Sequence, residues 1–196
     1  MKEPWDQVHG DPLAALRDGD PGPFERFVEV ETSTLLGFFR RLGASREEAE
    51  DLTQDTIVKL YRSAPRYEAR ERFEALAYRV ARNAWIDAGR RASVRPARAA
   101  GGDGALEAGL PRVASEPDVG RLAESRESGE RLEAAMARLS QAQREVFELG
   151  ALQELPYEQV AAILSIPVGT VKSRMFNAVR KLRELLETSD SGGAES

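Results

Sequence analysis

Residues 156–186 carry two runs of apolar side chains at helical spacing with a proline between them, and this pattern limits the possible folds of the 196-residue chain more than any other. The segment Ser165-Ile166-Pro167 predicts the break, because a residue that precedes proline is disfavoured in the helical region. Pro156 is expected at the first helical position of the first run, where its missing N–H costs nothing. The first run holds Val160, Ala161 and Leu164, and the second, which continues to Leu186, holds Val168, Val171, Met175, Val179 and Leu182. Two helices joined by so short a break predict a helix-turn-helix.

Three residues occupy positions that matter in such a motif. Ala161 is small enough for close contact between the helices, Ser165 lies in the turn, and Val171 supplies a buried aliphatic side chain on the second helix. Glycine is usual in the turn, so Ser165 costs up to about 1 kcal/mol if the turn requires a positive φ.

The second helix of the motif is strongly basic. It carries five cations and no anion between residues 172 and 183, namely Lys172, Arg174, Arg180, Lys181 and Arg183. Ser173, Phe176 and Asn177 lie among them and could contact base edges or thymine methyl groups in a major groove. Periodicity alone fits an ordinary helical domain equally well, and it is this concentration of charge that favours DNA binding.

Charge is distributed unevenly along the whole chain. The net charge is −5, yet residues 62–98 hold ten arginines against four acids. Acidic residues dominate the first 34 positions, residues 103–130 and the segment from Glu184 onward. Because salt screens exposed charges beyond about 8–10 Å, the two basic segments can still attract DNA locally.

Composition excludes several kinds of chemistry. The chain has no cysteine, and its single histidine, His9, lies in an N-terminal segment expected to be mobile. Disulfides, thiolate metal sites and a cysteine nucleophile are therefore absent, and we expect no cofactor, no small-molecule substrate and no enzymatic activity. No stretch approaches the roughly 20 apolar residues of a membrane span, and no signal peptide is evident, so no membrane insertion and a cytoplasmic location are expected.

Helical periodicity outside the motif predicts two all-α domains. Expected helices cover residues 23–42, 45–63, 72–91, 130–139 and 140–150, and Ser45/Glu48 and Ser140/Gln143 have the spacing of capping boxes. Buried faces are expected to include Phe24, Phe27, Val28, Leu35, Phe38 and Phe39 in the first helix, Leu52 and Val58 in the second, and Phe73, Leu76, Ala77, Val80, Ala81 and Ala84 in the third.

Between these groups of helices lies a segment rich in glycine, alanine and proline. It has too few large apolar residues to form a core, so it is expected to be a flexible linker. The predicted organisation is an N-terminal tail (1–22), a helical domain (23–92), a linker (93–129), a helix-turn-helix domain (130–187) and a C-terminal tail (188–196).

Four motifs in this order resemble the extracytoplasmic-function (ECF) sigma factors of bacterial RNA polymerase. They are residues 49–55 (AEDLTQD), 73–83 (FEALAYRVARN), the pairs 86–87 and 90–91, and residues 169–174 (GTVKSR). The resemblance covers residues 23–92 as a sigma-two domain and 130–187 as a sigma-four domain. It departs from the family pattern at Leu76-Ala77, where Trp-Leu is usual, and at Asn177, which is often arginine.

The resemblance implies a role for each surface. Asp51, Gln54 and Asp55 would bind the clamp helices of core polymerase. Contacts to the minus-ten element would come from Tyr67, Arg79, Arg82, Asn83, Arg90 and Arg91, with Tyr67 in the loop that captures an unpaired base. Trp85 and Tyr78 could stack on such a base or pack in the core. Contacts to the minus-thirty-five element would come from Thr170, Lys172, Ser173, Arg174, Phe176, Asn177 and Arg180.

The expected function is therefore that of a transcription initiation factor. Its expected partners are core RNA polymerase, promoter DNA and an anti-sigma factor. The alternative is a stand-alone helix-turn-helix regulator whose N-terminal domain dimerises or senses a ligand, but such a protein has no need of both the acidic strip at residues 51–55 and an arginine-rich helix. A helical adaptor that binds only proteins would leave the segregation of charge unexplained.

Overall fold

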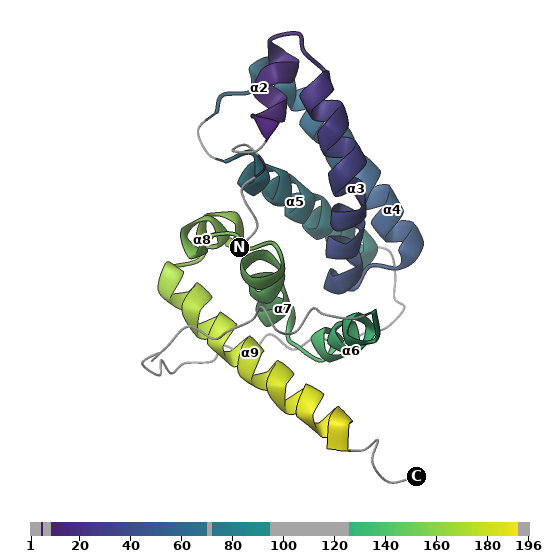
Figure 1. The fold of residues 1–196 in the computed structure, drawn as a ribbon, viewed down its shortest axis with the longest axis vertical. Helices are drawn as coiled ribbons and strands as arrows, with labels where there is room; N and C mark the ends of the chain where they lie inside the picture. The colour runs from purple at the N-terminus through teal and green to yellow at the C-terminus, as the bar shows by residue number, and fades with distance from the viewer. Residues whose placement is uncertain (1–4, 6–8, 70–71, 95–125, 192–196) are drawn as a thin grey trace. The chain divides into compact units, whose positions relative to one another are not determined.

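The structure, a computed structural model, describes residue 5 and residues 9–69, 72–94 and 126–191. Every regular element in these ranges is helical, which confirms the predicted all-α fold (Figure 1). The chain divides into two compact units, residues 1–98 and 99–196. No helix in the described ranges is both long enough and apolar enough to span a membrane.

The first unit is built around three long helices, α3 (Gly22–Leu42), α4 (Arg46–Ser63) and α5 (Phe73–Val94). A short helix, α2 (Pro12–Arg17), precedes them, and a 3₁₀ turn, η1 (Ala64–Arg66), follows α4. Helix α4 packs against both α3 and α5, so it is central to the bundle. Figure 1 shows these elements in purple to teal.

The connection between α3 and α4 follows from its sequence. Gly43 ends α3 with φ 109°, a left-handed conformation that glycine adopts without steric cost. Ser45 then caps α4 with the predicted capping box: its Oγ accepts from the Glu48 N–H at 3.2 Å, and the Glu48 carboxylate accepts from the Ser45 N–H at 2.8 Å. The N–H groups of Gly43, Ala44, Ser45 and Glu48 are therefore all hydrogen-bonded within this tight turn.

Aromatic side chains form much of the first core. The Phe27 ring lies 4.7 Å from that of Phe73 and meets it edge-on, and the ring of Phe38 lies 5.4 Å from that of Tyr78. Most of the residues expected to be buried are buried, with Phe38, Phe39 and Leu35 almost fully enclosed. Val28, Leu76 and Val80 are only half-buried, and Val58 is 43% exposed, so its predicted burial is wrong. Val58 faces outward because the buried side of α4 is formed by Leu52, Thr53, Thr56 and Leu60.

Residues 11–17, which fall within the expected tail of residues 1–22, form a capped helix. Asp11 caps α2 by accepting from the N–H groups of Leu13 and Ala14, and Pro12 takes the first helical position. Leu13 is fully buried, and α2 packs against α3, α4 and η1. This part of the predicted tail is therefore part of the bundle.

The second unit begins with α6 (Arg126–Ala137) and α7 (Gln141–Phe147). The predicted capping box at Ser140 is present, with Gln143 as its partner. The Arg144 guanidinium donates to three carbonyl oxygens at the end of α6, those of Met136, Ala137 and Leu139. Burial lowers the pKa of Arg144 from its usual value, and the hydrogen bonds to the carbonyls compensate for part of the lost hydration.

The helix expected to run through Gly150 changes geometry before it ends. A π-helical segment, η3 (Glu148–Leu152), follows α7. A Cβ atom at Gly150 would lie 2.7 Å from the Met175 methyl group, so the absence of a side chain there allows close approach to the later helix.

The helix-turn-helix itself is present as predicted. It consists of α8 (Tyr157–Leu164), a turn at Ser165–Pro167, and α9 (Val168–Ser191), drawn in yellow-green to yellow in Figure 1. Pro156 takes the N-cap rather than the first helical position, because its ψ of 143° is extended. Helix α9 continues past residue 187, into the expected C-terminal tail. Of the expected linker, residues 95–125 lie outside the described part of the chain.

Candidate nucleic-acid and polymerase interfaces

The acidic strip predicted on α4 is a continuous exposed surface. Asp51, Gln54 and Asp55 are all exposed, and separations of three and four residues place them on one face of the helix. The opposite face is buried, including two threonines whose hydroxyls are satisfied locally: Thr53 donates to the Ala49 carbonyl and Thr56 to that of Leu52, each at 2.7 Å. Since packing uses the other side of α4, this strip is available to a partner with basic groups.

The predicted arginines of α5 form a stripe along one side of the helix. Arg79 and Arg82 are half-buried and Asn83, Arg90 and Arg91 are exposed. Intervals of three, four and seven residues bring the first four of these residues onto one face, whereas Arg91 lies about 100° further around the helix than Arg90. The Arg91 Nε donates to the Asp87 carbonyl at 3.2 Å, which orients the guanidinium along the helix surface. Small side chains, Ala77, Ala81 and Ala84, are buried on the other side.

The aromatic residues near this stripe differ in accessibility. Tyr78 is 6% exposed and packs beside Phe38, so it belongs to the core. Trp85 is half-buried and keeps part of its ring accessible. Of these two candidates for base stacking, only Trp85 is reachable in this conformation.

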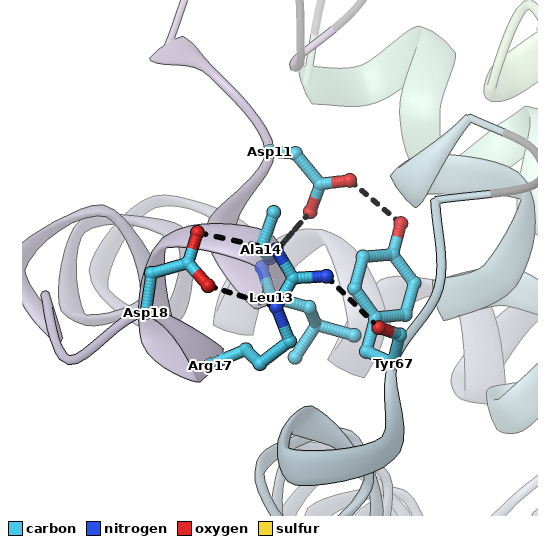
Figure 2. Close-up of polar contacts among 6 residues, drawn as sticks. All are labelled: Asp11, Leu13, Ala14, Arg17, Asp18 and Tyr67. Carbon is cyan, nitrogen blue, oxygen red and sulfur yellow. Dashed lines mark hydrogen bonds and ion pairs between the residues drawn. The ribbon is translucent and has the colours of Figure 1, made fainter.

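Tyr67, which follows η1, is not displayed on the surface. Its side chain is 7% exposed, its hydroxyl donates to Asp11 Oδ2 at 2.6 Å, and its carbonyl accepts from Arg17 Nη1 at 3.2 Å (Figure 2). The ring is therefore not open for stacking in this conformation. Sequence reasoning missed both partners, because they lie 56 and 50 residues earlier in the chain; only the helix-start signal Asp11-Pro12 could have drawn attention to them.

The turn of the helix-turn-helix has the conformation that the motif requires. Ser165 has φ 56° and ψ 45°, the left-handed region in which glycine is favoured. Ala161 is 7% exposed and Val171 is fully buried, as expected of the small contact residue and the aliphatic residue of the second helix. These two positions fix how α9 leaves α8.

The outer face of α9 carries the predicted reading residues. Lys172 and Arg180 are exposed, and Thr170, Ser173, Arg174, Phe176 and Asn177 are half-buried. The opposite face, formed by Val171, Met175, Ala178, Val179 and Leu182, is buried. Ser173, Asn177 and Arg180 follow one another at four and three residues and so share the outward stripe. Ser173 Oγ also donates to the Thr170 carbonyl at 3.1 Å and keeps its lone pairs for a further donor. This is the arrangement that a recognition helix presents to a major groove.

Comparison with known proteins places both units in one family. The family models for sigma-70 region 2 and sigma-70 region 4 match residues 27–95 and 129–182. The chain is 31% identical to the ECF RNA polymerase sigma factor SigE of Mycolicibacterium smegmatis over 88% of this chain and 65% of SigE. It is also 31% identical to the RNA polymerase sigma factor CarQ of Myxococcus xanthus, over 89% of this chain and 95% of CarQ.

A solved structure agrees with this placement. The sigma factor RpoE of Bartonella quintana, crystallised with the anti-sigma factor NepR, is 27% identical to this chain. The likeness covers 84% of this chain and 96% of that one, with a TM-score of 0.63. The motifs, the helical units and these relatives agree: the chain belongs to the ECF sigma factors, transcription initiation factors that bind core RNA polymerase and direct promoter recognition and DNA melting.

Proposed function

We propose that this sigma factor divides promoter recognition among three helical surfaces. The acidic strip of α4 docks on core polymerase, the arginine stripe of α5 holds the opened minus-ten strand, and the outer face of α9 reads the minus-thirty-five element. The observation that carries the proposal is the outward placement of all three sets of polar residues on helices whose opposite faces are buried. Each helix thus has one face for the core and one for a partner.

The chemistry of each surface suits its proposed partner. Asp51 and Asp55 can pair with arginines of a protein surface, since carboxylates and guanidinium groups form strong charge-assisted hydrogen bonds. The guanidinium groups of Arg79, Arg82 and Arg90 suit phosphates, and the amide of Asn83 can both donate to and accept from a base. On α9, Lys172 and Arg180 contact phosphates while Asn177 and Phe176 reach base edges.

DNA opening on this account needs no hydrolysis, and we propose that the chain is not an enzyme. Unpairing and unstacking a base costs a few kcal/mol. Stacking of an unpaired base on an aromatic ring returns about 1–3 kcal/mol, and contacts from polymerase supply the remainder. Trp85 is the half-buried aromatic residue one turn beyond Arg82 on α5 and could make such a contact, whereas Tyr67 would have to leave its buried position to stack.

We further propose that the protein acts in the cytoplasm, where polymerase and DNA are found, and that an anti-sigma factor controls it. The support for such a partner is the RpoE–NepR complex of a relative. The proposed functional domains remain residues 23–92 and 130–187. Residues 11–22 are a structural addition to the first of them, because Leu13 is buried in its core.

Reversing the charge of the acidic strip tests the docking surface. Asp51→Lys/Asp55→Lys should leave helicity nearly unchanged, because both residues are exposed, and should weaken binding to core polymerase by at least about 1–3 kcal/mol. Affinity is measured by competition for fluorescently labelled core. Glu29→Lys/Glu133→Lys, which changes the net charge equally at exposed sites on α3 and α6, is the control. If the strip variant competes as well as wild type does, α4 does not dock in the way proposed.

A further inference from the structure

Helix α2 is attached to Tyr67 at both of its ends. At the N-terminal end, Asp11 accepts a hydrogen bond from the Tyr67 hydroxyl at 2.6 Å; at the C-terminal end, Arg17 Nη1 donates to the Tyr67 carbonyl at 3.2 Å. Figure 2 shows the Tyr67 hydroxyl directed at Asp11 and the Tyr67 carbonyl directed at Arg17. Both its ring and its backbone are therefore held by one short helix.

Both carboxylate oxygens of Asp11 accept hydrogen bonds. One carboxylate oxygen caps α2 by accepting from the Leu13 and Ala14 N–H groups at 3.0 and 3.1 Å, which leaves the other for the tyrosine. A hydroxyl bound to an ionised carboxylate at this distance is among the stronger protein hydrogen bonds. Arg17 is in turn oriented by Asp18, at 2.8 and 3.1 Å. The two side chains that hold Tyr67, Asp11 and Arg17, are therefore each oriented by a further hydrogen bond within or next to α2.

A second attachment lies near the start of α5. The Trp5 backbone N–H donates to Glu74 Oε1 at 2.9 Å, and the Trp5 ring is 5% exposed, with its centroid 5.7 Å from that of Phe27. Glu74 is in the first turn of the helix that carries Arg79, Arg82 and Asn83. The N-terminal segment therefore contacts the chain both where it leaves η1 and where it enters α5.

We propose that Asp11 is a positioning residue for promoter opening, which acts by fixing Tyr67 and with it the direction in which the chain leaves η1 toward the minus-ten surface. The inference rests on the proposed minus-ten role of this region. If the chain around Tyr67 is already ordered before DNA binds, the entropy cost of ordering it does not reduce the free energy gained when a base is captured. Tyr67 contributes its hydroxyl as an anchor in this account, and its ring need not touch DNA.

The test uses holoenzyme reconstituted from core polymerase and the full chain. The probe is a single-stranded oligonucleotide of the non-template minus-ten strand, from a promoter mapped by run-off transcription, and a series in which each base in turn is replaced by an abasic site. The ratio of the affinity for the intact oligonucleotide to the affinity for an abasic one measures how strongly the missing base is captured. General damage to the fold would weaken binding to both oligonucleotides and leave the ratio of the two affinities unchanged.

Two substitutions isolate the contact. Asp11→Asn keeps a good N-cap for α2 but removes the charged acceptor, and Tyr67→Phe removes only the hydroxyl and keeps the ring. At the captured base, each substitution should reduce the ratio of intact to abasic affinity by about threefold or more relative to wild type, since a hydrogen bond to a charged group is lost. The double variant should be no worse than either single one, because both break the same bond. Glu29→Gln, which removes one exposed negative charge from α3, should leave the ratio at the wild-type value.

Three outcomes would contradict the inference. Full discrimination in Asp11→Asn would show that Asp11 positions nothing. Full discrimination in Tyr67→Phe with loss in Tyr67→Leu would show that the ring acts by direct stacking. A wild-type holoenzyme indifferent to every abasic site would instead overturn the minus-ten assignment itself, and the inference with it.

Discussion

Asn177 and Arg180 lie one turn apart on the exposed face of α9, and at the scale of single residues they are expected to act differently. Asn177→Ala should change the preferred base at one or two minus-thirty-five positions, since a lost base contact is worth about 1–3 kcal/mol of discrimination. Arg180→Ala should weaken all promoters alike and reduce the slope of binding against salt by about one. Both are measured by holoenzyme binding to a promoter library at several salt concentrations.

Arg138 provides the matched control for this pair. It is an exposed arginine of the same unit that lies on no proposed DNA surface, so Arg138→Ala should alter neither base preference nor salt slope. If Asn177→Ala keeps the wild-type base preference, the reading residue on α9 has been assigned wrongly.

Ser165 is one of two described non-glycine residues with a positive φ, the other being Glu154. Its φ of 56° is unfavourable for any side chain, so Ser165→Gly should stabilise the second unit by up to about 1 kcal/mol. Ser165→Ala keeps the steric cost and should give no gain. Both tryptophans of the chain, Trp5 and Trp85, lie in the first unit, so the unfolding of the second is followed by circular dichroism. Equal stability of the glycine variant and wild type would mean that the turn is not strained.

The residue-level predictions succeeded where the signal was local. Ser165 lies directly before Ile166-Pro167, so its place in the turn followed from the sequence, and its left-handed φ agrees with the need for a glycine-like residue. The burial of Tyr67 depends on Asp11, 56 residues away, and no periodicity connects two such positions. Val58 was assigned to the buried face because it is apolar, whereas the polar Thr53 and Thr56 occupy that face by bonding their hydroxyls within the helix.

Among the elements, α4 has the clearest dependence on pH. Hydrogen bonds from Ser45 hold the pKa of Glu48 below its usual value, with the backbone N–H as the larger cause and the side chain next. Because the folded pKa is lowered, the stabilisation is present above the unfolded pKa and is lost as pH falls through the folded value. Glu48→Gln should therefore cost no more than about 0.3–1 kcal/mol at neutral pH, since solvent screens this exposed carboxylate, and the difference should shrink as acidic pH protonates Glu48.

Unfolding of the first unit, followed by tryptophan fluorescence, measures this difference at each pH. Glu47→Gln is the control, because Glu47 is an exposed carboxylate in the same first turn that does not form the capping box. A difference between wild type and Glu48→Gln that stays constant from pH 7 to pH 3 would rule out the charged capping contact.

Helix starts were predictable because caps are local patterns. Ser45 and Ser140 each precede their partner by three residues, and both capping boxes formed. The π-helical segment at Glu148–Leu152 is not predicted by the sequence, because helical periodicity does not distinguish it from the end of an α-helix. The sequence predicts only a tail where α2 lies, since six residues are too few for periodicity to reveal a helix and the burial of α2 depends on α3 and η1.

For the whole molecule, the segregation of charge carries the functional reading. A net charge of −5 alone would argue against DNA, yet the cations of α5 and α9 are placed on exposed or half-exposed faces of these helices. The acidic strip of α4 lies on an exposed face of its own helix, so one chain presents surfaces of both signs. This combination fits a factor that must hold a protein partner and DNA at the same time.

Permanganate reactivity of unpaired thymines in the minus-ten element is the most direct test of this account. Core polymerase together with the chain should make these thymines reactive on a cognate promoter, whereas neither component alone should do so. Asn83→Ala should leave closed-complex binding largely intact and slow the appearance of reactivity, because Asn83 lies exposed on the arginine stripe of α5. Wild-type opening rates in Asn83→Ala, or opening that does not require the chain, would contradict the proposed division of work among α4, α5 and α9.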